Sequence, residues 1–405
     1  MHEMNKIIPN EVKPLAIVMG RNYTTRLTLA RAAGLVGCDV VLIQTNRRKN
    51  NSLKIDRSSR FVVNCHFCPE PNQQLLIDTI RIYEHSNRKK LLIPADDYVA
   101  SVIDKHLDVL KGHFLMPHVK GVQGEVLKIM DKSYQKALAS KAGLEVAKGW
   151  VAEYIDKGFI IPTGISYPCF VKPMESYDGP LKNHSKRCDN EMELKYQLSK
   201  IASFYHLPLL IEQFVQIEKE YGVQGISMED KTVIPSIVRK DSSLRGITAT
   251  GQIYPITSFD GLEEKLAAFL KETCFTGIFD IDLFESNGKF YFNELNVRLG
   301  ANGFAMTYGV SNVPGLFLLY LLGESKGEYE GPVDFKPLSF VSEQVIREMY
   351  YDGIISFKKY RRTIKEAEIS SLQFKGDESP YKEFSKIDWI LPLWRCLRKY
   401  RKGKK

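Results

Sequence analysis

Two neighbouring segments, residues 277–284 (GIFDIDLF) and residues 290–300 (FYFNELNVRLG), decide the fold of this 405-residue chain. Both have the apolar and aromatic composition of strands, and the joint at residues 285–289 (ESNGK) contains an Asn-Gly pair typical of a tight hairpin. Successive side chains of a strand point to opposite faces, so the polar side chains of each segment share one face. These residues are Asp280 and Asp282 on the first strand and Glu294, Asn296 and Arg298 on the second.

This polar face has the chemistry of a metal and phosphate site. Mg²⁺ prefers one or two carboxylates together with nucleotide phosphates, and a nearby arginine can bind a phosphoryl oxygen. An exposed polar strand face with salt bridges would explain any one of these residues better. Five of them on matched faces of one hairpin favour a metal site.

Two lysines upstream have positions suited to binding phosphate. Lys172 follows the apolar run at residues 169–171 (CFV) and precedes a proline, so it lies at the end of a predicted strand. Lys132 lies at or just before the start of a helix predicted for residues 133–142. A single lysine is more often a solvated surface group, so neither position identifies a phosphate site by itself.

A further polar segment, residues 212–215 (EQFV), follows the apolar strand predicted for residues 209–211, and Glu220 begins another strand. The end of a strand can offer backbone groups to an adenine edge and an acidic side chain to ribose hydroxyls. The alternative is an ordinary linker between domains.

The first 110 residues alternate strand and helix patterns. The turn after the first strand, residues 20–23 (GRNY), is not GxGxxG, so a dinucleotide-binding fold is the weaker interpretation. Alternation of this kind predicts a parallel sheet that binds ligands at the carboxyl ends of its strands, here near Arg21, Asp96 and Asp97. The strands are predicted at residues 15–19, 39–44, 61–63 and 90–94, and the helices at residues 24–36, 74–84 and 98–110.

Length and composition exclude several classes of protein. A chain of 405 residues is too long for one core and predicts two or three lobes, and 44% hydrophobic with 26% charged residues excludes wholesale disorder. We expect no spanning helix, because no apolar run reaches roughly 18 residues. Seven scattered cysteines predict a reducing, cytoplasmic setting, and Cys65–Cys68 lacks the second pair of a zinc site.

The net charge of +9 comes mostly from one terminus. Residues 395–405 contain seven lysines and arginines and no acid, which leaves about two positive charges for the rest of the chain. With Trp389 and Trp394 beside them, these cations suit either an anionic membrane surface or a solubilising end. No nucleic-acid reading motif surrounds them, so we expect no nucleic-acid partner.

Taken in order, these motifs resemble the ATP-grasp superfamily of carboxylate-amine ligases over about residues 15–325. Among its members the chain is most similar to D-aspartate ligase and to proteins related to the carbamoyl phosphate synthase large subunit. The resemblance implies an α/β class and an ATP-grasp fold with an N-terminal parallel α/β (pre-ATP-grasp) domain. The expected divisions are that domain at 1–125, a small lobe with a central linker at 126–215, a large lobe with the metal site at 216–335 and a C-terminal extension at 336–405.

The resemblance also implies roles for individual residues, with ATP and Mg²⁺ or Mn²⁺ as cofactors. Arg298 and Lys172 would be catalytic, and Asp282, rather than Asp280, would bind the metal. Two departures from the family pattern are Val297 in place of a proline and a phosphate loop with one glycine. The other implied ligands are Glu294 and Asn296 for the metal; Lys132, Lys172, Ser176 and Gly179 for phosphate; Glu212, Gln213, Phe214 and Val215 for adenine; and Glu220 for ribose.

The implied reaction transfers a phosphoryl group from ATP to a carboxylate, and an amine then attacks the acyl phosphate to form an amide. Small-molecule carboxylates and amines would be the substrates, with an amino-acid ligase acting on a cell-envelope precursor as the narrower expectation. Arg239 and Arg245, in a polar segment that is equally well a solvated loop, would join Arg298 at the carboxylate. Two alternatives stay open: an enzyme that uses bicarbonate, of the carboxylase or carbamoyl phosphate type, and a nucleotide-binding protein without turnover.

Overall fold

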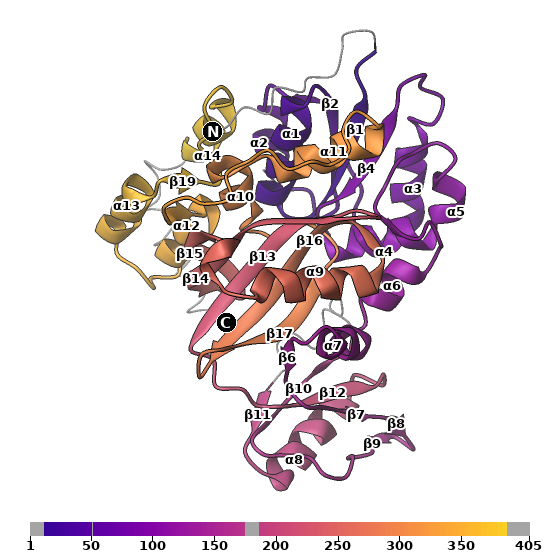
Figure 1. Cartoon of the computed structure of the whole chain (residues 1–405), viewed down its shortest axis with the longest axis vertical. Coiled ribbons are helices and arrows are strands. Elements are labelled where there is room, and N and C mark those ends of the chain that lie inside the picture. Colours follow the sequence, from indigo (N-terminus) through magenta and orange to yellow (C-terminus); the bar gives the residue numbers. More distant parts are fainter. Residues whose placement is uncertain (1–11, 51, 175–185, 387–405) are drawn as a thin grey trace.

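The computed structural model describes residues 12–50, 52–174 and 186–386. Ser176, Gly179 and the basic segment 395–405 therefore lie outside the described residues. The described chain forms a parallel sheet with its helices, a small antiparallel sheet at one end of the molecule, and a large mixed sheet between them (Figure 1).

The first sheet has the strand order β3-β2-β1-β4, and all its pairs are parallel, as the alternating pattern predicts. Its helices begin with polar caps: the Asn22 side chain accepts from Thr24 N at α1, and that of Asp96 accepts from Val99 N at α4. The strands are β1 (Leu15–Gly20), β2 (Asp39–Gln44), β3 (Val62–Phe67) and β4 (Lys90–Pro94). The helices are α1 (Tyr23–Leu35), α2 (Ser52–Arg57), α3 (Gln73–Arg81), α4 (Asp97–Lys105) and α5 (Leu107–Leu110).

A connecting region leads to the small lobe, whose sheet has the order β11-β10-β12-β7. Alternation divides β10: Cys169 and Val171 are buried beneath α8, whereas Phe170 and Lys172 face the opposite side. The connecting elements are β5 (His118–Val119), α6 (Glu125–Ile129), α7 (Lys132–Lys141) and β6 (Glu145–Val146). The lobe consists of β7 (Gly149–Ala152), β8 (Tyr154–Ile155), β9 (Gly158–Phe159), β10 (Cys169–Pro173), β11 (Lys186–Cys188), α8 (Glu191–Ala202) and β12 (Leu209–Gln213).

The large sheet has the order β19-β18-β15-β14-β13-β16-β17-β6, with β5 paired to β16 beyond this path. One face is covered by α9, and the other carries the polar residues of the hairpin β16–β17. Its elements are β13 (Lys219–Ser227), β14 (Thr232–Leu244), β15 (Ile247–Pro255), α9 (Leu262–Thr273), β16 (Phe275–Ser286), β17 (Lys289–Asn296), α10 (Gly303–Gly309) and α11 (Val313–Leu322).

The residues after 336 extend this large sheet. β18 pairs antiparallel with β15, and β19 pairs parallel with β18. A buried ion pair fastens the segment to the first domain: Arg31 Nε on α1 donates to Asp377 Oδ2 at 2.8 Å. The expected domain boundaries stay a prediction. The elements here are β18 (Leu338–Val341), α12 (Glu343–Tyr351), α13 (Phe357–Glu366), β19 (Ile369–Ser370) and α14 (Ser379–Ser385).

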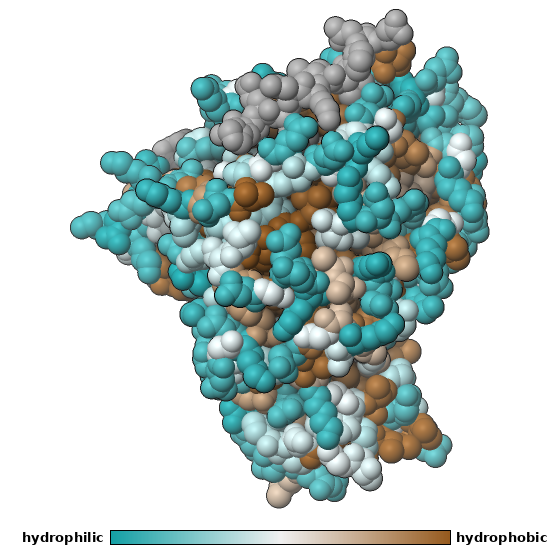
Figure 2. All heavy atoms as spheres, viewed as in Figure 1, coloured by the Kyte–Doolittle hydropathy of each residue, from teal (hydrophilic) through white to brown (hydrophobic). Residues whose placement is uncertain are grey.

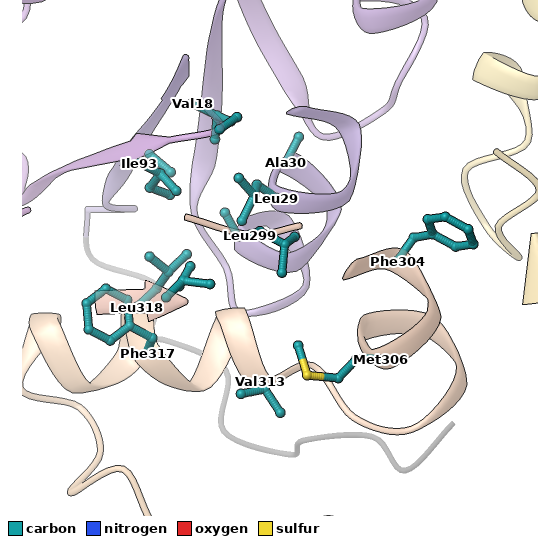
Figure 3. Close-up of a cluster of buried hydrophobic side chains, with 14 of the residues drawn as sticks. Val18, Leu29, Ala30, Ile93, Leu299, Phe304, Met306, Val313, Phe317 and Leu318 are labelled. Atoms are coloured by element: carbon teal, nitrogen blue, oxygen red, sulfur yellow. The ribbon is translucent and has the colours of Figure 1, made fainter. Parts of the chain in front are cut away.

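The first domain and the large lobe share one apolar core, part of which is shown in Figure 3. Val18 of β1, Leu29 of α1 and Ile93 of β4 belong to the same buried cluster as Phe317 and Leu318 of α11. Burying a side chain of this size stabilises a fold by roughly 1.5–3 kcal/mol. The shared core therefore holds the carboxyl edge of the parallel sheet in a defined position over the large sheet.

Apolar residues are distributed over short helices and scattered surface positions. Within the described ranges, no single helix is long and apolar enough to cross a membrane, and α10 with α11 match by length and composition only as a pair bent by 84°. The face seen in Figure 2 is largely hydrophilic, with hydrophobic residues exposed near its centre and at the side of the small lobe near β8 and β9. Ile155 and Ile160 are exposed there.

Candidate active site

A cleft of about 630 Å³ lies where the three bodies meet. The first domain contributes Arg21, Asp96 and Asp97 to its wall, and the small lobe and the large sheet contribute the rest. Ten residues predicted from the sequence line this cleft together: Lys132, Lys172, Glu212, Gln213, Phe214, Val215, Asp282, Glu294, Asn296 and Arg298.

The hairpin β16–β17 brings its polar side chains together as the alternation predicts. Asp282 is the direct register partner of Glu294, and Asp280 is that of Asn296. The register shifts between Asp282 and Leu283, because Asn293 is an extra residue on β17. A bulge of this kind re-aims side chains, and here both Asn293 and Glu294 line the cleft.

Arg298 is held by acceptors from two domains. Its Nε lies 3.2 Å from Asp97 Oδ1, its Nη1 lies 3.3 Å from Asp280 Oδ2, and its Nη2 lies 3.0 Å from Asn296 Oδ1. Burial opposes the charge of this guanidinium, but the carboxylates of Asp97 and Asp280 raise its pKa above the ordinary value. Arg298 therefore stays cationic beside the carboxylates.

Two carboxylates on alternate positions of β16 repel each other. Burial, and then the charge of Asp282, raise the pKa of Asp280 to about 6. Lys240 Nζ donates to Asp282 Oδ1 at 2.5 Å. Burial lowers the pKa of this lysine, but Asp282 and Asp280 outweigh that effect and raise it. Two carboxylates, Asp280 and Asp282, thus lie next to two cations, Arg298 and Lys240, at and beside the wall of the cleft.

Three lysines lie on the wall formed by α7 and the small lobe. Lys132 and Lys136 are four residues apart, and therefore on one face of α7, and Lys172 is the last residue but one of β10. The Glu212 carboxylate forms ion pairs with both Lys136 and Lys172, and Lys172 Nζ also donates to Asn293 Oδ1 at 3.3 Å. One carboxylate offsets three ammonium groups, so this wall attracts anions.

Burial and mutual repulsion tune this lysine cluster. Burial, and then the charge of Lys132, lower the pKa of Lys136 to about 8. Burial lowers the pKa of Lys172 well below its ordinary value, and the charges of Lys136 and Lys132 add to the effect. A bound polyanion would restore the protonated state of both side chains.

Aromatic and aliphatic side chains line another part of the cleft. Phe170, Ile217, Phe284 and Tyr291 contribute apolar surface beside the segment 212–215. The Arg187 guanidinium carbon lies 4.5 Å from the centroid of the Phe214 ring. A flat apolar ring of adenine type suits this part of the cleft, because aromatic walls provide stacking area and the end of β12 offers backbone groups.

Several predicted site residues lie away from this cleft. Glu220, Arg239 and Arg245 are not among the residues that line it. Arg239 pairs with Asp241 at 2.8 Å, and Arg245 pairs with Asp352 at 2.8 Å. A solvated loop was one of the two alternatives for this segment. Most of the segment is instead strand, because β14 continues to Leu244 and pairs with β15, and Arg245 follows in the turn between them. Ser176 and Gly179 lie outside the described residues.

The sequence-based prediction gave no role to four residues that lie in the cleft or contact a residue that lines it. Lys136 could have been found from its i, i+4 spacing to Lys132. Asn293 depends on the bulge, Lys240 on the reach of its side chain across β13, and Arg21 on the packing of the first domain. Arg21 was expected only as part of the edge of the first sheet near which ligands bind, and Asn293 and Lys240 have no local signal in the sequence.

The hairpin β16–β17 presents oxygen atoms of the kind that bind a divalent cation. Across the described ranges, no group of three or more His, Cys, Asp or Glu side chains could hold a metal by itself. Asp282 and Glu294 nevertheless stand opposite each other with the Asn296 amide beyond them, and an ammonium group already binds Asp282. Two carboxylates and an amide fit Mg²⁺ when phosphate oxygens complete its coordination.

For the ATP-dependent activity that the resemblance implies, we expect kcat/KM for ATP to fall as the pH rises through about 8, the pKa of Lys136. Deprotonation removes a positive charge from the wall of three lysines. Lys136→Arg keeps that charge and should move the fall in kcat/KM to higher pH. The free energy of unfolding should rise over the same range, because the unfolded chain binds more protons between pH 8 and roughly 10.4. An unchanged pH profile in Lys136→Arg would contradict the assignment.

The fold of this chain is similar to that of solved structures, although its sequence is not similar to that of curated proteins. No protein-family model and no curated protein matches the sequence. An L-amino acid ligase from Bacillus licheniformis matches with a TM-score of 0.59 and 15% identity, over 82% of this chain and 80% of that chain. An N5-carboxyaminoimidazole synthetase from Staphylococcus aureus, complexed with ADP, matches with a TM-score of 0.60 and 15% identity, over 82% and 83% of the two chains. The biotin carboxylase domain of a Hydrogenobacter thermophilus 2-oxoglutarate carboxylase, with MgADP, ADP and bicarbonate, matches with a TM-score of 0.57 and 16% identity, over 78% and 71%.

The chain therefore has the ATP-grasp fold, preceded by a parallel α/β domain. The α/β class and the fold expected from the ordered motifs are confirmed. At 13–17% identity across the matching structures, the likeness concerns the fold, and the activity of this chain must be argued from its own residues.

Proposed function

We propose that this protein is an ATP- and Mg²⁺-dependent, ADP-forming ligase that joins a carboxylate to an amine. The observation that carries the proposal is the cleft itself. A wall of three lysines, Lys132, Lys136 and Lys172, faces a hairpin that presents Asp282, Glu294, Asn296 and Arg298. A cationic wall opposite paired carboxylates suits a metal-bound polyphosphate.

The nucleotide would lie across this cleft, with adenine in the apolar part and the phosphates along the lysines. Two of the matching structures were solved with ADP, one of them as MgADP, which supports ATP and Mg²⁺ as the cofactors here. Asp282, Glu294 and Asn296 would hold Mg²⁺. When bound, this ion would neutralise phosphate charge and orient the transferred group.

The side chains of the chain itself then perform three tasks. The lysines hold the phosphate oxygens and offset repulsion between the nucleotide and an anionic carboxylate. Arg298, fixed by Asp97 and Asp280, would lie where charge spreads over the phosphoryl oxygens during transfer. Positioning of the two substrates supplies most of the remaining rate enhancement, so no covalent protein nucleophile is needed.

The carboxylate and the amine are proposed by class. An amino acid as one substrate is supported by the L-amino acid ligase among the matching structures, and action on a cell-envelope precursor is the narrower form of this proposal. A second candidate is the use of bicarbonate as the carboxylate, which is supported by the matching carboxylase domain solved with bicarbonate. Arg239 and Arg245 stay candidates for substrate recognition in conformations other than this one.

Release of ADP in the presence of substrate pools tests the proposal. ADP that forms only when a pool of amino acids supplies both a carboxylate and an amine would support the ligase. ADP that depends on bicarbonate would favour the second candidate. Tight ATP binding without ADP in any pool would contradict both and favour a nucleotide-binding protein.

The basic segment leads to a separate prediction about membranes. Deletion of residues 395–405 removes seven cations and should reduce pelleting with vesicles of anionic lipid, because each basic residue near such a surface contributes about 1 kcal/mol. Activity on small substrates should stay unchanged, since the proposed site uses none of these residues. Equal pelleting of the full chain and the deletion variant would remove the proposed peripheral membrane contact.

A further inference from the structure

A lysine forms an ion pair with one carboxylate of the proposed metal site. Lys240 on β14 binds Asp282 Oδ1 at 2.5 Å, and its side chain is only 17% exposed. Asp282 is also the carboxylate expected to bind Mg²⁺ together with Glu294. The same oxygen-rich position thus attracts both an internal cation and the proposed external one.

A glycine makes this contact possible. β13 lies between β14 and β16, and its Gly222 is the register partner of both Val238 and Asp282. A Cβ atom on Gly222 would lie 3.5 Å from Lys240 Cε and 3.5 Å from Asp280 Oδ1. Any side chain larger than alanine would therefore enter the space through which Lys240 crosses the middle strand.

Charge balance explains why a lysine is present. Asp280 and Asp282 point to the same face of β16, so their like charges repel in a part-buried site. Arg298 compensates Asp280 at 3.3 Å, and Lys240 compensates Asp282. A divalent cation at Asp282 would be repelled by the ammonium and would make its compensating charge unnecessary.

We propose that Lys240 is an internal counter-ion that holds the place of the divalent cation in the nucleotide-free protein and leaves Asp282 when the metal binds. The inference rests on the proposed function, because it requires a cation site at Asp282 and Glu294. The further point is that a metal ion must compete with the Lys240 ammonium group for Asp282. Lys240 therefore weakens metal binding before nucleotide arrives.

Binding of Mn²⁺ to the nucleotide-free protein, followed by the electron paramagnetic resonance signal of free Mn²⁺, tests the competition. Lys240→Met should bind Mn²⁺ about tenfold more tightly than wild type, because a competing like charge is removed. Lys219→Met is the matched control. It removes a lysine of β13 that pairs with Glu285 of β16 at 2.9 Å, outside the cleft, and should bind Mn²⁺ like wild type. Equal or weaker binding by Lys240→Met, or no Mn²⁺ binding by either protein, overturns the proposal.

A measurement on wild type avoids reliance on a folded variant. Acylation of lysine amines, read by peptide mass spectrometry, should increase at least about threefold at Lys240 when Mn²⁺ is added, because an amino group that has left Asp282 is accessible to the reagent and is no longer held in its protonated form by the carboxylate. Labelling of Lys219 should not change. If Lys240 stays protected in a protein that turns over ATP, this inference fails and the proposed function stands. If Lys240 is released but no pool yields ADP, the proposed function fails and the cation site stands.

Discussion

Replacing Arg298 with lysine is expected to lower kcat for ADP formation about 1,000-fold, the effect typical of losing an arginine that stabilises phosphoryl transfer. The transferred group spreads its charge over three oxygens, and a guanidinium can donate two parallel hydrogen bonds to them. A lysine provides the charge as a single point without that planar fork. The loss should therefore fall on kcat more than on the KM for ATP.

The surroundings of Arg298 make lysine a clean substitution. A lysine ammonium keeps a positive charge between Asp97 and Asp280, so no buried carboxylate loses its compensation. The melting temperature should therefore stay within a few degrees of wild type. Arg362→Lys is a suitable control, because Arg362 is exposed and pairs with Glu366 on its own helix. More than about a tenth of wild-type kcat in Arg298→Lys would contradict the role of Arg298.

Glu294→Gln is expected to lower ADP formation at least about 100-fold, in line with the loss of one preorganised electrostatic contact in an active site. Glutamine has nearly the same shape but removes one of the two carboxylate charges that face each other across the hairpin. Two carboxylates become one, and the hard oxygen site loses much of its affinity for a divalent cation. Mn²⁺ binding should weaken together with the activity.

The control for this variant comes from the same hairpin. Glu285 pairs with Lys219 and accepts from Tyr221 Oη at 2.7 Å, outside the cleft, so Glu285→Gln should keep both activity and Mn²⁺ binding. Thermal unfolding of Glu294→Gln should match wild type, because Glu294 is only partly buried. Near-normal ADP production by Glu294→Gln would show that the metal assignment is wrong.

The hairpin could be predicted from the sequence because its information is local. A strand repeats every two residues, and the Asn-Gly turn sets the register, so Asp282 and Glu294 had to share a face once the strands paired. Lys172 followed from the same logic at the end of β10. Other features were hidden: β3 runs over Val62–Phe67 rather than residues 61–63, because Asn64 and His66 interrupt its apolar pattern.

Longer-range features could not be predicted in this way. β15 was not predicted. The polar residues at the end of β14 have the composition of a loop, and they form a strand only because β15 pairs with them. Glu212 was expected near adenine, yet it pairs with two lysines. Its strand lies beside β10, and α7 packs against the hairpin strand β17. Such contacts depend on which elements become neighbours rather than on their own patterns.

The amino-acid sequence alone determined the hairpin, its polar face, two of the three lysines that line the cleft and, through the order of its motifs, the ATP-grasp fold. Only the tertiary structure decided how these parts are held in relation to one another. Asp97 and Arg298 are separated by 201 positions, and they meet because a shared apolar core sets the first domain over the large sheet. Lys240 reaches Asp282 because a glycine lies between their strands. Periodicity within a segment reports which face a side chain takes, whereas distances between segments follow from packing.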